Sequence, residues 1–380
     1  MLFCVILAVL PGGCAEEPNP VGARLLPAGD LIHLDTTVVW GIRSYNQITI
    51  PKASTGARIL IGHVNNIECW GLLRFSYLPD STRYYPIVSA ELQLRTNYHF
   101  GDSLAPFSLS IYQILQNWVT DSLTIDSVKA PGFYSPVVSG SANYSSVGDT
   151  STLTIPLDTT MIRAWGTLSD TLITNFGVLL RPTNSAVVKG FGSFLAANAS
   201  LYPVLLLRFR DIADNIDTLI ENLGQHHYVT TGLDPTWASD STHLYVMNGG
   251  AYRGFVEFDV DSLPAHGAVH KATLELTLDA QRSQFNMYTS DSTYAFFIAN
   301  DSTVATYVYA VGGPVQNGNT RIYQFPIGSF VQRWLRGATQ HRLAIAGYTE
   351  PNTLDLFSFY GATAAPARRP KLTIIHSLIQ

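Results

Sequence analysis

The sequence predicts an all-β protein made of two tandem jelly-roll-like β-sandwich modules, each with a short helix near its C-terminal part. Most apolar runs are short, rich in β-branched or aromatic residues, and bounded by Gly, Pro, Asn, Asp or Ser, which is typical of strands. Few long amphipathic helical patterns are present. One pattern of two alternating runs also occurs twice, at residues 71–94 and 253–278. Many short strands joined by turns favour a sandwich or jelly roll.

The repeated pattern describes two strands joined through a Leu-Pro loop. In the second copy Val256, Phe258 and Val260 share one face, because successive side chains of a strand point to opposite faces. In the first copy the inward positions are held by Leu73, Phe75 and Tyr77. We therefore expect these residues to lie in two equivalent cores.

A short helix is predicted in each copy, at 161–165 ("MIRAW") and 330–334 ("FVQRW"). Its apolar residues recur at i, i+1 and i+4, which places them on one helical face. Trp165 and Trp334 should therefore pack into the core. Strand-like segments flank each helix and a Pro-led strand closes each copy, at 202–209 and 369–375.

The two copies define the expected domain boundaries. Their repeated stretches begin at Gly71 and at Arg253. We expect the first module over 30–210, a short polar linker at 211–217, and the second module over 218–380. A short linker favours stacked modules.

Composition narrows the function classes. The chain has 380 residues, of which 46% are hydrophobic and 13% charged, and a net charge of -5. This composition suits a folded protein with a large core. A mildly acidic chain without basic runs gives no electrostatic footprint for nucleic acid or for a membrane surface.

The N-terminus has the character of an export signal. Residues 2–10 are apolar, and "PGGC" and a polar stretch follow. This run is too short to span a bilayer as a helix and suits a signal peptide. The segment ending at Cys14 resembles a bacterial lipobox, which implies that 1–14 is removed, that Cys14 carries a lipid, and that 15–29 is a tether. A simple secreted protein and a buried N-terminal strand are the alternatives.

Taken together, the "LLRF…LP…A.L.L" opening, the "VQRWLRG" helix and the "FSFYG…RPKLTI" ending resemble the DNRLRE-type (disaggregatase-related) β-sandwich modules. The segment 111–126, which contains Trp118, is similar to the middle of such a module. The resemblance covers about 30–210 and 215–377. It implies a secreted or surface β-sandwich protein, and some family members are carbohydrate-binding modules. The matched positions are mostly core and turn residues, so they bear on fold more than on ligand.

Residue patterns for catalysis or metal binding are absent from the sequence. It contains no G-x-S-x-G, H-E-x-x-H or C-x-x-C motif, so we expect no catalytic residues, no metal ligands and no cofactor. Cys69 is expected to be a small buried apolar residue. His226 and His227 are expected to be loop histidines; on a strand they would point to opposite faces. Structural calcium remains an alternative without assignable ligands, since calcium needs several oxygen ligands.

Carbohydrate binding would use exposed aromatic rings with polar groups beside them. Five residues outside the repeated core positions are the candidates for such exposed rings, although partial burial as a loop anchor is the interpretation we favour for each: Trp40, Trp118, Trp237, Tyr84 and Tyr85.

We therefore expect an exported, lipid-anchored, non-catalytic protein of the outer membrane or cell surface, or a secreted one. It would bind polysaccharide or serve as an adhesive scaffold for other surface proteins, without nucleic acid, and would meet the membrane only through its N-terminal lipid. A structural subunit that assembles with its own kind through sheet faces or edges is the alternative. A polysaccharide-degrading enzyme that uses paired carboxylates such as Asp259 and Asp261 is a third. The sequence leaves the oligomeric state open.

Overall fold

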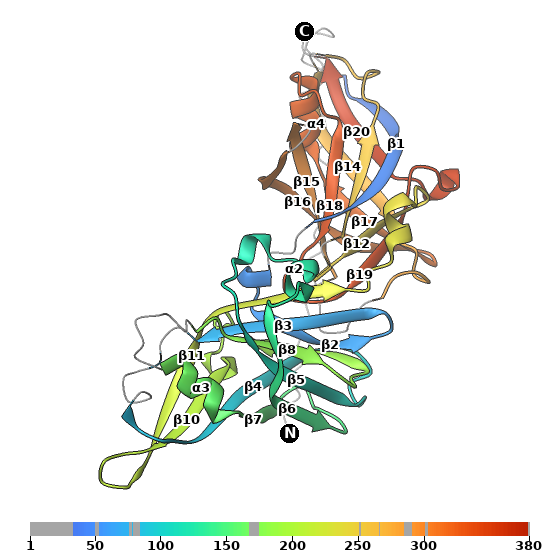
Figure 1. Cartoon of the computed structure of the whole chain (residues 1–380). Coiled ribbons are helices and arrows are strands. Elements are labelled where there is room, and N and C mark those ends of the chain that lie inside the picture. Colours follow the sequence, from blue (N-terminus) through green and yellow to red (C-terminus); the bar gives the residue numbers. More distant parts are fainter. Residues whose placement is uncertain are drawn as a thin grey trace, which may run out of the picture.

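The structure, a computed structural model, shows that the chain is all-β, as predicted (Figure 1). It describes residues 33–49, 53–75, 78, 84–166, 175–250, 252–265, 267–284, 291–300 and 303–378. The predicted signal peptide, Cys14, the tether and the predicted core position Tyr77 lie outside these residues. The strands form two separate ten-stranded antiparallel sheets.

The first sheet runs in the order β10-β11-β3-β2-β9-β4-β7-β6-β5-β8. Further pairings of β10 with β4 and of β3 with β8 close it on itself. Closure leaves few unpaired strand edges in the described part of this sheet. Its strands are β2 (Arg58–Val64), β3 (Ile67–Phe75), β4 (Ile87–Gly101), β5 (Phe107–Ile114), β6 (Tyr134–Tyr144), β7 (Thr152–Leu157), β8 (Val178–Pro182), β9 (Val187–Gly192), β10 (Val204–Arg210) and β11 (Ile216–Thr231).

The second sheet runs in the order β1-β20-β14-β17-β16-β15-β18-β13-β12-β19. A pairing of β1 with β13 closes eight of these strands into a ring. Its strands are β1 (Asp35–Ile48), β12 (His243–Met247), β13 (Tyr252–Phe258), β14 (Gly267–Thr277), β15 (Thr293–Asn300), β16 (Thr303–Asn317), β17 (Thr320–Pro326), β18 (Arg342–Gly347), β19 (Leu356–Tyr360) and β20 (Lys371–Leu378).

Two strands turn the corners of the second sheet. β1 pairs first with β20 and then with β13, and its register shifts between Gly41 and Arg43. β16 pairs with β15 up to Gly312 and with β17 from Gly313 onward. A Cβ atom on Gly312 would lie 2.2 Å from the Phe325 ring. The corner therefore needs a residue without a side chain, as is usual where a strand bends between sheet layers.

Helices are short and few in the described part of the chain. α3 (Thr159–Gly166) and α4 (Gly328–Leu335) lie where the sequence predicts helices. Trp165 packs into the core of the first sheet and Trp334 into the core of the second. The remaining helical turns are α2 (Ile125–Lys129), η2 (Ala53–Thr55), η3 (Thr120–Ser122), η4 (Ala199–Leu201), η5 (Pro235–Ser239) and η6 (Pro366–Arg368).

Strand pairing departs from the predicted boundaries at both ends of the first half. β1, expected in the first module, pairs only with β13 and β20 among the described strands. The predicted linker 211–217 is instead the turn of a hairpin between β10 and β11. Asp211 Oδ1 accepts hydrogen bonds from the N–H groups of Ala213 and Asn215, both at 2.8 Å. A polar turn and a polar linker have the same composition, and only the pairing of the next strand distinguishes them.

The two sheets share a packed junction (Figure 1). Leu354 N–H donates to the Tyr98 hydroxyl at 3.0 Å, and the Tyr228 hydroxyl donates to Pro351 O at 3.1 Å. Five side chains from the second half also complete the core of the first sheet: Tyr245, Met247, Tyr252, Leu354 and Leu356. An apolar and hydrogen-bonded contact of this kind favours a fixed arrangement of the two halves.

Candidate binding surface

In the second sheet β16, β15 and β18 run side by side (Figure 1). A cluster of aromatic rings lies on the outer face of these three strands. On β15 the buried side chains of Thr293, Ala295 and Phe297 alternate with the half-buried Tyr294 and Phe296. This alternation places the inward set in the core and the two aromatic rings on the outside. We call Tyr294, Phe296, Tyr307, Tyr309 and Tyr348 the aromatic face.

Tyr294 lies at the centre of the aromatic face. Its ring stacks on Tyr348, with centroids 4.9 Å apart and an interplanar angle of 28°. Tyr309 meets it edge-on at 5.0 Å, and Phe296 lies 5.3 Å away. These distances fall within the range of favourable aromatic pairs, so the rings hold one another in place.

The outer members of this cluster are open to solvent. Tyr309 is 51% exposed, Tyr348 just after β18 is 44% exposed, and Tyr307 is 82% exposed. Burial, together with its neighbours Tyr348 and Tyr309, raises the pKa of Tyr294. This phenol therefore remains protonated at neutral pH and can donate a hydrogen bond beside the ring surface.

The aromatic face continues across the sheet as a single row. The register places Tyr45, Phe255, Ala344, Phe296 and Tyr309 side by side on β1, β13, β18, β15 and β16. Tyr45 stacks on Phe255 with ring centroids 4.8 Å apart. A single small residue, Ala344, separates this pair from the rings on β15. Phe255 and Ala344 are buried in a small apolar cluster, against which Tyr45 and Phe296 pack. The middle of the row is therefore covered, and its aromatic ends are the more open parts.

Charged side chains lie along one side of this row of aromatic residues. Arg342 Nη1 donates to the Tyr45 hydroxyl at 3.2 Å, and the Arg43 guanidinium lies over the Tyr45 ring at 5.3 Å. Glu257 carboxylate oxygens lie 3.7 Å from Arg43 Nη1 and 4.0 Å from Arg342 Nη1. Donors and acceptors thus stand beside an apolar surface, which is the combination that carbohydrate hydroxyls and ring faces require.

The structure does not bring the five predicted ligand residues together. Trp118 is only 3% exposed; its Nε1 donates to Phe176 O at 2.9 Å and Arg74 lies over its ring. Its prediction as an exposed ring is wrong, because the 111–126 segment folds back over β3 and β8 and buries it. Trp40 is 42% exposed on β1, in the part that pairs with β20.

The tyrosine pair lies near the first sheet instead. Tyr84 is exposed, and the Tyr85 ring stacks on Phe209 with centroids 5.8 Å apart. These two and Trp40 therefore mark separate places on the molecule. The ligand candidates predicted from the sequence do not include Tyr294, Phe296 or Tyr309. The alternation in "TYAFFIA" and "TYVYAV" was the available signal, but it does not say which face of the strand is covered.

Trp237 is a loop anchor beside a polar cluster. Its ring stacks on Tyr245 at 4.8 Å. The Tyr245 hydroxyl donates to Asp240 Oδ2 at 2.8 Å, and burial and Asp240 raise the pKa of Tyr245 to about 12. His243 lies between two carboxylates, with Nδ1 3.4 Å from Asp240 and Nε2 3.2 Å from Asp279. These contacts fasten η5 to β12.

The other residues singled out in the sequence have structural roles; they are Cys69, His226, His227, Asp259 and Asp261. Cys69 is buried, and burial raises the pKa of its thiol to about 12. His226 and His227 are not loop residues as expected but buried residues of β11, because that strand continues through them into the junction. Asp259 accepts the N–H of Asp261 at 3.0 Å, so this pair shapes a turn.

No group of three or more His, Cys, Asp or Glu side chains among the described residues could hold a metal ion. Within the same part of the chain, no helix has the length and apolar character needed to cross a membrane.

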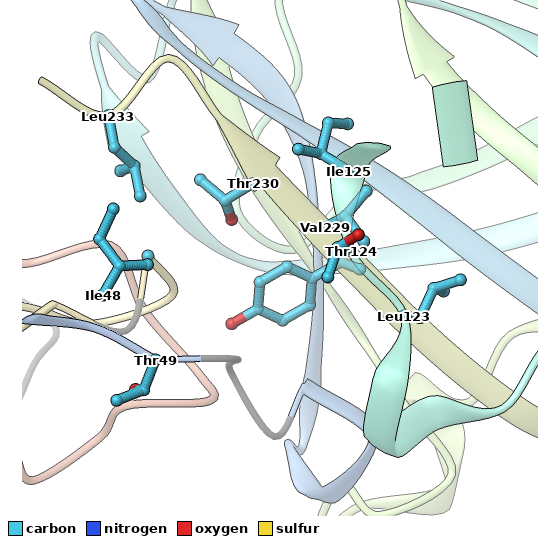
Figure 2. Close-up of a pocket in the computed structure, with 10 residues that line it drawn as sticks. Ile48, Thr49, Leu123, Thr124, Ile125, Val229, Thr230 and Leu233 are labelled. Carbon is cyan, nitrogen blue, oxygen red and sulfur yellow. The ribbon is translucent and has the colours of Figure 1, made fainter. Parts of the chain in front are cut away.

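A small pocket lies at the junction of the two halves. In Figure 2 Ile48, Thr49 and Leu233 face Leu123 and Ile125 across it. Its volume is about 200 Å³. Pockets for small organic molecules usually have about 300–1,000 Å³ and several convergent polar groups. We therefore regard it as a packing gap between the end of β1 and the α2 segment.

Comparison with known proteins gives few relatives. No family model matches the chain, and no curated protein matches it. A structure of deformed wing virus, a honeybee pathogen, is 11% identical, covers 96% of this chain and 93% of that chain, and has a TM-score of 0.15. A structure of Macrobrachium rosenbergii nodavirus is 8% identical, covers 99% and 96%, and has a TM-score of 0.10. Such low scores carry no argument about function.

Proposed function

We propose that this is an exported, non-catalytic protein that binds polysaccharide through the aromatic face of its second sheet. The observation that supports this proposal is the packing of three rings around Tyr294, two of which, Tyr309 and Tyr348, are open to solvent. Sugar rings present C–H surfaces that pack on aromatic faces, while their hydroxyls seek charged or polar partners. Arg43, Glu257 and Arg342 supply such partners at the edge of the same row.

The same proposal includes the relation between the two sheets and the attachment of the chain to a membrane. The two closed sheets would be copies of one jelly-roll-like module of the DNRLRE type, and Cys14 would attach the chain to a membrane by a lipid. Polysaccharide recognition at a cell surface fits this arrangement, because a lipid tether leaves the sheets free to meet an external glycan. Intact mass measurement of protein from a bacterial membrane fraction, compared with Cys14→Ser, tests the lipid.

The binding test is affinity electrophoresis of the full chain in gels that contain single soluble polysaccharides, acidic and neutral. We expect retardation in at least one of them. Tyr309→Ala and Tyr348→Ala should each weaken binding about tenfold, since loss of a stacked ring costs on the order of 1.4 kcal/mol or more. Tyr309→Phe should retain most of the affinity, because it keeps the ring.

Matched controls come from the other exposed aromatic residues. Trp40→Ala and Tyr84→Ala remove exposed rings that lie away from the aromatic face, and we expect no change in retardation. A loss of binding in Trp40→Ala with full binding in Tyr309→Ala would place the site on the other part of β1. An absence of retardation in every polysaccharide would contradict the proposal.

Self-assembly is the second candidate function. The observation that favours it is that each closed sheet takes one strand from the other half of the chain.

A further inference from the structure

β1 and β11 hold the same place in the two halves of the chain. β1 precedes β2, which pairs with β3 and β9; β11 precedes β12, which pairs with β13 and β19. The chain therefore repeats one order of strands, β1–β10 and then β11–β20. β3 and β13 belong to the repeated stretches 71–94 and 253–278. This sequence repeat aligns the two series of strands independently of their pairing.

The sequences of the two strands agree with this alignment. Asp35 and Thr36 near the start of β1 correspond to Asp217 and Thr218 of β11. Asp35 lies opposite His376 of β20, as Asp217 lies opposite Phe209 of β10. The same difference in numbering holds farther along, because Asn46 lies opposite Gly254 of β13 as Tyr228 lies opposite the equivalent Gly71 of β3. Both strands also have a bulge at the same place, between Gly41 and Arg43 in β1 and between Leu223 and Gln225 in β11.

Each of these strands completes the sheet of the other half. β11 pairs with β10 and then with β3, so it closes the first sheet. β1 pairs with β20 and then with β13, so it closes the second sheet in the same way. Had each strand stayed with its own series, β1 would have paired with β10 and β3. The two halves have therefore exchanged their first strands.

The position between β20 and β13 in the second sheet fits β1 better than it would fit β11. Asn46 is buried there, and its Nδ2 donates to Trp237 O and His243 O, both at 2.9 Å. Its Oδ1 accepts the N–H of Tyr245 at 2.7 Å. The residue of β11 at this position is Tyr228, which lies opposite Gly71 as Asn46 lies opposite Gly254. Its single hydroxyl cannot replace the two donors and the acceptor of the amide, so buried groups would be left unpaired. An unpaired buried polar group costs about 1–3 kcal/mol, so the exchanged arrangement is favoured.

We infer that the place between β13 and β20 also accepts β1 from a second copy of this chain, which gives a strand-exchanged oligomer. The pairing, the hydrogen bonds of Asn46 and the burial of Val39 would be the same whichever copy supplies the strand. Exchange of an identical element between copies is a low-cost route to oligomers. Cis pairing is favoured only by effective concentration, which is on the order of millimolar for a short connection.

The test uses two cysteine pairs that share one residue. Val38 on β1 and Thr273 on β14 both lie directly opposite Thr373 on β20 and point outward with it. Directly opposite residues in antiparallel strands have a spacing that a disulfide can bridge. Val38→Cys/Thr373→Cys reports on β1, and Thr273→Cys/Thr373→Cys is the matched control. Both carry Cys4→Ser and Cys14→Ser; Cys69 is buried and stays.

Reduced full-length protein is concentrated to about millimolar, warmed close to its unfolding midpoint and cooled, and oligomers are isolated by size exclusion. They are then oxidised and run on denaturing gels without reductant. We expect chains joined by disulfides from the Val38→Cys/Thr373→Cys oligomer and single chains from the control oligomer. Intrachain disulfides in both variants, or no oligomer at all, would overturn the inference. Joined chains in both would show general unfolding and overturn it equally.

In a second experiment the disulfide is formed before the protein is warmed. Monomer of Val38→Cys/Thr373→Cys oxidised before warming should lose at least nine-tenths of its oligomer, because β1 can no longer leave its place. The oxidised control should form as much oligomer as the unsubstituted chain. Undiminished oligomer from the locked β1 variant would show that association uses another surface.

Discussion

At the scale of single residues, burial decides what a side chain does, and two neighbouring histidines illustrate this. His226 and His227 are both almost fully buried on β11. Burial lowers the pKa of each to about 4, with a smaller contribution to His227 from His226. They act as neutral residues of the junction, since a charged imidazolium there would lack the hydration it has in water.

These depressed pKa values predict a loss of stability in acid. Between about pH 6.5 and pH 4 the unfolded chain takes up protons that the native chain does not. The stabilising contribution is therefore complete above about pH 6.5 and is lost as the pH falls toward 4. Its size is on the order of 3 kcal/mol for each histidine. Urea unfolding at about pH 7 and about pH 4.5 measures the loss.

Substitution isolates the contribution of one histidine. We expect the free energy of unfolding of His227→Gln to fall less between the two pH values than that of the unsubstituted chain. His33→Gln, at an exposed position, should keep the full decrease. An equal decrease in His227→Gln and the unsubstituted chain would show that this imidazole is protonated as readily when folded as when unfolded.

At the scale of elements, the corners of the second sheet depend on backbone shape. β16 leaves β15 at Gly312 and joins β17 at Gly313, which lets one strand serve both layers. The same strand carries Tyr307 and Tyr309 outward, so this bend helps to set the position of the aromatic face. Regular alternation in the sequence does not predict such a corner, because the strand remains extended on both sides of it.

Two adjacent glycines test this corner. Gly312→Ala should lower the free energy of unfolding by about 1–3 kcal/mol, because its methyl group would lie 2.2 Å from the Phe325 ring in the core. Gly313→Ala meets nothing within 4 Å, so its effect should stay within about 0.5 kcal/mol. Chemical denaturation of both variants gives the comparison. Equal destabilisation by the two substitutions would mean that backbone freedom, not space, is what the corner requires.

At the scale of the whole molecule, the exchanged strands tie the two halves together. Neither closed sheet is complete without a strand from the other half, and side chains of the second half lie in the core of the first. Unfolding one half must therefore expose the core of the other. We expect the described part of the chain to unfold in a single cooperative transition.

Tyr98→Phe tests this cooperativity at the junction. It removes the hydroxyl that accepts the N–H of Leu354 at 3.0 Å and should cost about 1–3 kcal/mol by leaving that group unpaired. Calorimetry should show one transition, shifted as a whole to lower temperature, with equal calorimetric and van't Hoff enthalpies. Tyr144→Phe, which loses a hydrogen bond at the surface of the first sheet, should change it little. Two transitions with only one shifted would show independent halves.

Local chemistry in the sequence determined the strand content, the two cores, and the positions of Trp165 and Trp334, because alternation and helical spacing depend only on near neighbours. The recurrence of the 71–94 pattern at 253–278 is also visible in the sequence alone. Only the tertiary structure decided that β1 closes the second sheet and β11 the first, that Trp118 is covered, and that Tyr294 and Tyr309 meet Tyr348 on one outer face. These outcomes depend on which distant strands pair, and pairing energy is nearly the same for many partners until whole layers pack.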